Sequence, residues 1–92
     1  MSMVRMFVRH DVADYAKWRA AYDDFDAERK TLGVIGHGVF RDVDNPNNVT
    51  AWHDFADAKA AKSFASLERL KSVMQAAGVQ GVPQMWFAAD ST

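Results

Sequence analysis

The chain contains no cysteine among its 92 residues. This absence excludes disulfide bonds, thiolate metal sites and a cysteine nucleophile. A chain of this length makes one small domain, and such a domain buries only about 60–70% of the surface that its unfolded form exposes. We therefore expect a single domain over residues 1–92 that gains stability from burial against a partner.

Neither an excess of basic residues nor a long apolar run is present. The 11 basic and 12 acidic residues give a net charge of −1, which argues against binding to nucleic acid or to an anionic membrane. The apolar segments are too short to span a bilayer. Arg5 and Arg9 interrupt the start of the chain, where a secretory signal would need an apolar run. We therefore expect a cytoplasmic protein.

Local patterns predict four strands and two helices in the order β-α-β-β-α-β. Runs rich in valine and aromatic residues predict strands, and apolar residues at helical spacing predict helices. Asp14 and Asp57 are suitable N-caps, and Gly33 and Gly78 suit the ends of the helices. The predicted strands span residues 3–10, 34–43, 49–55 and 82–89. The predicted helices span residues 15–32 and 58–77. The second helix is expected to break at Ser66, which would cap the segment that follows.

Short connections and right-handed crossovers favour one arrangement of these elements, an α+β ferredoxin-like fold. It has a four-stranded antiparallel sheet in the order 4-1-3-2 with both helices on one face. The other face is also apolar, because Phe40 points away from Val39, and Trp52 points away from Ala51 and Phe55. We predict a homodimer through this uncovered face, with Trp52 or Phe40 at the interface. A monomer with scattered surface aromatics is the alternative.

The chain resembles one superfamily in the order of its features. Trp18, Arg29 and Gly33 mark the first helix, and an alanine-rich helix and a final strand end the chain. Between them lie Arg41-Asp42, Asp44-Asn45-Pro46-Asn47 and the strand end His53-Asp54-Phe55. This order is similar to that of the dimeric α+β barrel superfamily, in particular its small antibiotic-biosynthesis-monooxygenase-like and cyclase-like members.

The resemblance covers nearly the whole chain and implies the fold and the dimer. The superfamily hosts cofactor-free monooxygenases, haem degraders, isomerases and decarboxylases, so the resemblance does not select one activity. Its haem-degrading members carry a particular set of Asn, Trp and His residues that has no counterpart here. No catalytic residue is therefore carried over.

Two histidines, His37 and His53, flank the predicted turn at 44–48. Opposed residues in an antiparallel hairpin have a constant sum of residue numbers, and any even sum places both histidines on one face. With Val43 opposite Val49, the two rings are two pairing positions apart. An odd sum, or a bulge at either glycine beside His37, separates them.

His10 is the third histidine and lies at the end of the first predicted strand. A metal usually needs three or four ligands, and no His-x-His or similar spacing is present. We therefore predict no metal and no cofactor. The histidines are either structural, each with one backbone or carboxylate partner, or they line a pocket for a small molecule.

Arg29 lies on the apolar stripe of the first predicted helix, as do Trp18 and Tyr22. A guanidinium on such a face must be paired or must reach past the helix end. In one interpretation the helix dipole favours this cation near the helix C-terminus. In the other, Arg29 lies at the mouth of a cleft between helix and sheet and binds a carboxylate or enolate oxygen.

The predicted ligand pocket lies between this helix and the sheet. Trp18, Tyr22, His37 and His53 line it, with Arg29 near its edge. Three hypotheses follow. The first is a cofactor-independent monooxygenase- or cyclase-like enzyme acting on a small aromatic or enolisable molecule, with His37 or His53 as the base and Arg29 holding the anion. The second is a non-catalytic or stress-associated dimer that holds a small apolar ligand. The third is a structural dimer with a filled core, which would lack the cavity of about 300 Å³ or more that a ligand needs.

Overall fold

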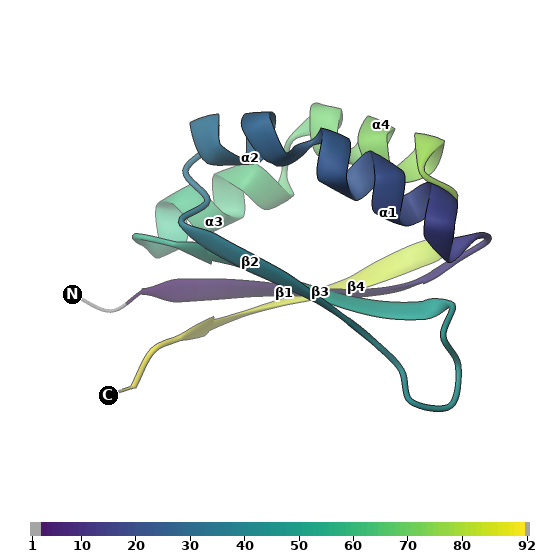
Figure 1. Ribbon diagram of the computed structural model, residues 1–92. Coiled ribbons are helices and arrows are strands. Elements are labelled where there is room, and N and C mark those ends of the chain that lie inside the picture. Colours follow the sequence, from purple (N-terminus) through teal and green to yellow (C-terminus); the bar gives the residue numbers. More distant parts are fainter. Residues whose placement is uncertain (1–2, 92) are drawn as a thin grey trace.

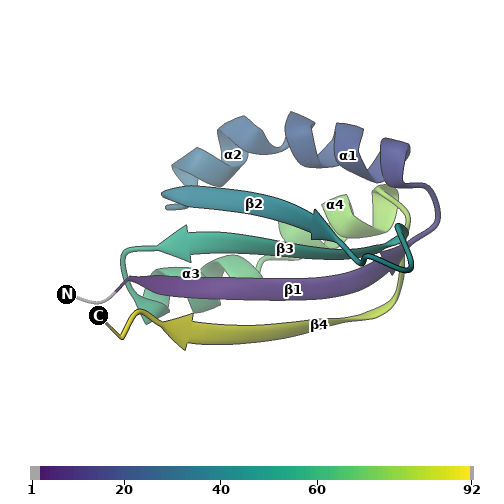
Figure 2. The ribbon, with the colours of Figure 1, turned by 60° about the horizontal axis from the view of Figure 1, so that its bottom comes forward.

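Four antiparallel strands form one sheet, and every helix lies on the same face of it (Figure 1). The computed structural model describes residues 3–91. The strands are β1 (Val4–Val12), β2 (Gly36–Arg41), β3 (Asn48–Phe55) and β4 (Val79–Ala89), and they pair in the order β2-β3-β1-β4 (Figure 2). This order confirms the predicted ferredoxin-like α+β fold.

The first predicted helix is two helices, α1 (Tyr15–Asp24) and α2 (Asp26–Thr31), which meet at Phe25. Charge explains the break, because Asp23 and Asp24 are unfavourable at a helix C-terminus, whereas Asp26 is favourable in a first turn. The break also exposes carbonyls at the end of α1, and the Tyr22 carbonyl accepts a hydrogen bond from Arg29. The prediction of one continuous helix over 15–32 was wrong.

The second helical region divides where predicted, into α3 (Ala58–Ala65) and α4 (Glu68–Ala76). Ser66 does not cap α4, however, because its hydroxyl turns back and donates to the Lys62 carbonyl at 2.8 Å. The predicted caps Asp14 and Asp57 are confirmed by their bonds to backbone N–H groups three residues ahead. Within residues 3–91, no helix has the length and apolar content needed to cross a membrane.

Two strands are longer than predicted, β1 by continuing to Val12 and β4 by starting at Val79. Gly81 and Pro83 suggested a strand boundary in the sequence. The structure accommodates both in an irregularity of the β1–β4 pairing instead, as bulges commonly do. β2 is shorter than predicted and begins at Gly36.

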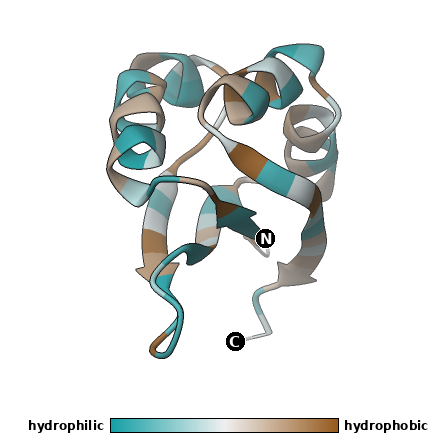
Figure 3. Ribbon diagram, turned by 90° about the vertical axis from the view of Figure 1, so that its right-hand side faces the viewer, coloured by the Kyte–Doolittle hydropathy of each residue, from teal (hydrophilic) through white to brown (hydrophobic). Residues whose placement is uncertain are grey.

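The helices form a layer over one face of the sheet (Figure 3), and the buried apolar residues of both layers pack together as the core. The buried residues of β1 alternate along the strand with half-buried or exposed ones, which places one face against the helices. The opposite face carries aromatic side chains: Phe7 stacks on Trp86 with ring centroids 5.2 Å apart, and Phe40 is 63% exposed. Trp52 lies over Gly38 on this face. Large apolar residues on both faces are therefore confirmed.

Candidate functional site

His37 and His53 lie directly opposite each other on the helix-facing side of the β2–β3 hairpin. Their rings stack with centroids 6.0 Å apart and an interplanar angle of 22°. The predicted shared face is thus confirmed, but the predicted separation of two pairing positions was wrong. The pairing register differs from the assumed one, because Arg41, and not Val43, lies opposite Val49. Asp42 accepts hydrogen bonds from the backbone N–H groups of Asp44 and Asn45, both at 3.0 Å, where the chain turns.

His53 is a neutral hydrogen-bond donor in this environment. Burial, with help from the nearby Arg29 cation, lowers the pKa of His53 to about 3. Its Nε2 lies 3.1 Å from Nε of Arg29, and because a guanidinium only donates, Nε2 is the acceptor. The ring hydrogen of neutral His53 is therefore on Nδ1, which is buried and has no partner among residues 3–91. This state argues against His53 as a base at neutral pH.

Arg29 is the buried cation of the site and is only 2% exposed. Its guanidinium donates to His53, to Oδ1 of Asp26 at 3.3 Å and to the Tyr22 carbonyl at 2.8 Å. It also lies 4.0 Å from the centre of the Tyr22 ring. Burial lowers the pKa of Arg29, and these partners hold the charge in place. The expected pairing is present, but Arg29 lies inside the protein, whereas the sequence placed it at a pocket edge.

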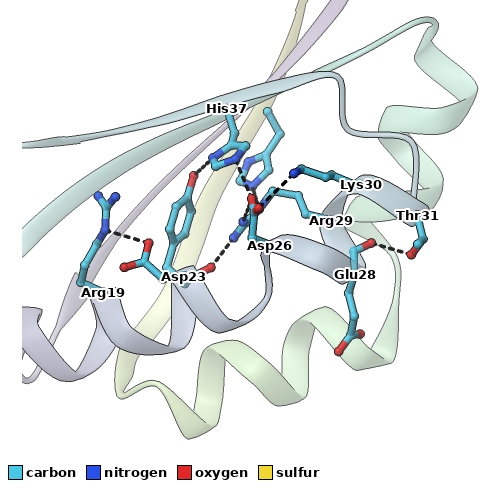
Figure 4. A network of polar contacts seen from close by, with 10 residues as sticks. Arg19, Asp23, Asp26, Glu28, Arg29, Lys30, Thr31 and His37 are labelled. Carbon is cyan, nitrogen blue, oxygen red and sulfur yellow. Dashed lines mark hydrogen bonds and ion pairs between the residues drawn. The ribbon is translucent and has the colours of Figure 1, made fainter.

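His37 links Tyr22 to Asp26, and Figure 4 shows its ring facing Asp26. Nε2 of His37 is 3.0 Å from Oδ1 of Asp26, and Nδ1 is 2.5 Å from the Tyr22 hydroxyl. A carboxylate accepts only, so Nε2 carries the hydrogen and Nδ1 accepts from the hydroxyl. Burial acts to raise the pKa of Asp26, but Lys30 and His37 lower it below its ordinary value. Asp26 therefore stays ionised and holds His37 with its free lone pair toward Tyr22.

A cavity of about 50 Å³ lies between the helices and the sheet beside this network, smaller than the roughly 300 Å³ expected of a ligand site, so a ligand would enter only if side chains moved. Trp18, Tyr22, Arg29 and His53 line it, together with apolar side chains of all the helices except α2 and of β1, β3 and β4. His37 is not among the lining residues, but it is bonded to the Tyr22 hydroxyl. The structure thus brings four of the five predicted pocket residues to one cavity and connects the fifth to it by a hydrogen bond.

Sequence reasoning missed two polar residues here. Asp26 precedes Arg29 by three positions and Lys30 by four. Opposite charges at this helical spacing would have indicated that Asp26 pairs with both cations. His10 was placed at a strand end, yet it is 5% exposed and lines the cavity. The alternation of Val4, Met6 and Val8 continues through His10 and would have placed its side chain on the buried face.

Metal-binding side chains do not converge in the described part of the chain. Among residues 3–91, no group of three or more His, Cys, Asp or Glu side chains is placed to hold a metal ion.

No family model and no curated protein matches the chain. Its structure is similar to a mutant of SnoaB, a cofactor-independent oxygenase from Streptomyces nogalater, with a TM-score of 0.79 and 16% identity over 100% of this chain and 96% of the other. The chain has the ferredoxin-like α+β fold of this structure. A putative antibiotic biosynthesis monooxygenase from Caulobacter crescentus has the same fold, with a TM-score of 0.78 and 16% identity over 99% and 92% of the two chains.

A dimeric ferredoxin-like protein from an uncultured marine organism is also similar, with a TM-score of 0.67 and 12% identity over 100% and 98% of the chains. At these identities the likeness shows the fold. At the level of the fold, it confirms the resemblance that the sequence suggested. The roles of individual side chains follow from the geometry of this chain.

Proposed function

We propose that the protein is a cofactor-independent monooxygenase-like enzyme that removes a proton from a small aromatic or enolisable molecule. The observation that carries the proposal is the buried Nδ1–H of His53, which has no acceptor among residues 3–91, beside the buried Arg29 cation in a cavity wall. An unsatisfied buried donor costs about 1–3 kcal/mol. Binding of a substrate oxygen would recover that cost.

Arg29 and His53 would hold the oxygen of the anion that forms. A guanidinium has five N–H groups, and Arg29 uses three of them on His53, Asp26 and the Tyr22 carbonyl. A fixed cation next to a neutral donor stabilises an enolate or phenolate more than the neutral substrate, because the charge on the oxygen develops during the reaction.

Tyr22, His37 and Asp26 would receive the proton. The substrate gives its proton to the Tyr22 oxygen while the Tyr22 hydroxyl passes its own to Nδ1 of His37. The resulting imidazolium is paired with Asp26 at 3.0 Å. The arrangement resembles a catalytic triad of a carboxylate, a histidine and a hydroxyl. Here Tyr22 transfers the proton from the substrate to the base, His37.

The anion then supplies the electrons for oxygenation. An activated methylene and one dioxygen molecule give a carbonyl and one water molecule, so both oxygen atoms are accounted for and no external reductant is needed. The likeness to a structure described as a cofactor-independent oxygenase supports this choice of reaction.

The homodimer is part of the proposal. Phe40 and Trp86, at 63% and 44% exposure, lie on the sheet face that no helix covers. A second copy packed on this face would bury them. The similar structure described as dimeric supports this arrangement.

The test uses two enolisable probes, acetylacetone and 2-indanone. Exchange of their acidic C–H hydrogens in heavy water is followed by NMR, and dioxygen uptake is followed with an electrode. We expect the protein to accelerate exchange with at least one probe, and Tyr22→Phe to lose about 100-fold or more of that rate, the usual contribution of a general acid–base group. Tyr15→Phe is the matched control, because Tyr15 also lies on α1 but lines no part of the cavity.

If the protein accelerates neither hydrogen exchange nor dioxygen uptake with either probe, the proposal that it is an enzyme is wrong. Saturable binding of a probe without exchange would favour the non-catalytic ligand-binding hypothesis. An equal loss in Tyr15→Phe and Tyr22→Phe would show that the relay is not specific.

A further inference from the structure

His10 lies where the pairing between β1 and β4 is irregular. Arg9 pairs with Gln84 and Asp11 pairs with Gln80, so residues 81–83 of β4 face His10 alone. Gly81 has a positive φ of 70°, and the side chain that follows it is almost fully exposed. β4 therefore bulges away from β1, and the sheet is locally open beside His10.

Both ring nitrogens of His10 lack a partner. The residue is 5% exposed, and Nδ1 and Nε2 are buried without a hydrogen bond to any residue of 3–91. Burial lowers the pKa of His10, although Asp11 acts to raise it, so the ring is neutral and offers one donor and one acceptor. Buried polar groups in native proteins are nearly always hydrogen-bonded, so two unpaired nitrogens on one ring indicate a partner from outside the chain.

An open groove adjoins the cavity near His10. It lies between α4 and the bulge, has a volume of about 510 Å³, and shares Met74 and Met85 with the cavity wall. Methionine is unbranched and adapts its shape readily. A change of rotamer at these two side chains would join groove and cavity into one site, larger than the roughly 300 Å³ that a small-molecule ligand needs.

We propose that His10 binds a neutral hydroxyl or carbonyl group of an aromatic small molecule that enters the interior cavity through the groove at the β4 bulge. Trp18 packs against His10 with ring centroids 5.6 Å apart and an interplanar angle of 65°, and provides an aromatic wall beside the polar contact. A carboxylate is disfavoured at this position, because a neutral imidazole would not compensate its lost hydration.

This contact lies away from the proposed reaction centre. His10 pairs with Val49, which precedes His53 by four residues on β3, a separation of about 13 Å along a strand. Both histidines line the cavity, but from different positions along the sheet. The inference shares the cavity of the proposed function but does not depend on proton transfer at Tyr22 or His37.

The test is an NMR titration of the full chain with three probes that share one ring: benzyl alcohol, toluene and benzoate. The signals observed are the imidazole nitrogens of His10 and the methyl groups of Met74 and Met85. We expect benzyl alcohol to bind about 3- to 10-fold more tightly than toluene, which is the effect of one neutral hydrogen bond. Benzoate should not shift the His10 signals.

Variants locate the hydroxyl. His10→Phe should abolish the preference for benzyl alcohol while toluene still binds, which also shows that the variant is folded; His10→Leu serves if His10→Phe does not fold. His10→Gln, which keeps a donor and an acceptor, should retain the preference. Exchange of the enolisable probes in Tyr22→Phe is a separate measurement, so the two proposals fail separately.

Three results would overturn the inference. The first is equal affinity for benzyl alcohol and toluene, or no saturable binding of either. Ordered water would then be the hydrogen-bond partner of His10. The second is a preference that persists in the apolar His10 variants but disappears in His53→Gln. The third is binding that leaves both methionine methyl signals unmoved, which would exclude the groove as the route.

Discussion

Acidification should destabilise this protein through His53, by an amount that the structure allows us to calculate. The pKa of His53 is about 3 in the folded protein, against an ordinary value of 6.5. Between these values the unfolded chain binds a proton that the folded chain does not, so stability falls as the pH falls. Each pH unit in this window costs about 1.4 kcal/mol.

The full effect is large for a domain of this size. Lowering the pH from 6.5 to 4.5 should cost about 2 kcal/mol through His53 alone, and lowering it from 6.5 to 3 roughly 4 kcal/mol. Domains of this kind have a total stability of about 5–15 kcal/mol. Loss of this contribution would therefore be visible in any denaturation experiment.

The assay is urea denaturation followed by tryptophan fluorescence at several pH values, for the wild type and His53→Gln. Glutamine can still accept from Arg29 but does not titrate, so the difference between the two proteins isolates His53 from the carboxylates. His10→Gln is the control for the other buried histidine. We expect the stability difference between wild type and His53→Gln to change by about 2–3 kcal/mol from pH 6.5 to 4.5.

Parallel pH profiles for the two proteins would refute this reasoning. They would mean that His53 accepts a proton in the folded state. Its Nδ1–H would then not be a fixed neutral donor, and the proposed oxygen-binding site would lose one of its two components.

Further predictions concern the sheet and metals. Gly38→Ala should cost about 1–3 kcal/mol, because the added Cβ would lie 2.6 Å from Nε1 of Trp52, whereas Gly36→Ala, with its nearest contact at 3.6 Å, should be nearly neutral; equal effects in urea denaturation would contradict this. Phe40→Asp should convert a dimer to a monomer in sedimentation, and a monomeric wild type at tens of micromolar would contradict the dimer. Trp52→Asp should dissociate or unfold the protein, because Trp52 also packs against Arg5 at 4.0 Å within the chain, and an unchanged dimer would count against an interface on this face. Stoichiometric zinc, iron or copper in protein purified without an affinity tag would contradict the prediction that no metal is bound.

Most of the fold was predictable because it depends on local patterns. Alternation fixed which residues of β3 face the helices, and the predicted caps Asp14 and Asp57 mark the start of their helices. The errors lie where tertiary contacts decide the outcome. Phe25 divides the first helix where Arg29 turns back to the Tyr22 carbonyl, and nothing in helical periodicity indicates such a contact.

The candidate site was predictable as a group of residues but not in its chemistry. Spacing placed His37 and His53 on one face, whereas the register that brings them directly opposite, with Arg41 paired to Val49, was not predicted. The roles of the two rings differ because one is buried beside Arg29 and the other is half-buried beside Asp26. Those environments exist only in the folded protein.

The ionisation state of bound 4-nitrophenol tests the central claim most directly. Its phenolate absorbs in the visible range and its phenol does not, so a spectrum recorded just below the pKa of the free compound reports which form is bound. The account predicts that the protein binds it as the phenolate, with the proton on His37, and that Arg29→Met abolishes this conversion. Binding as the neutral phenol, or phenolate binding that is unchanged in Arg29→Met, would contradict the account.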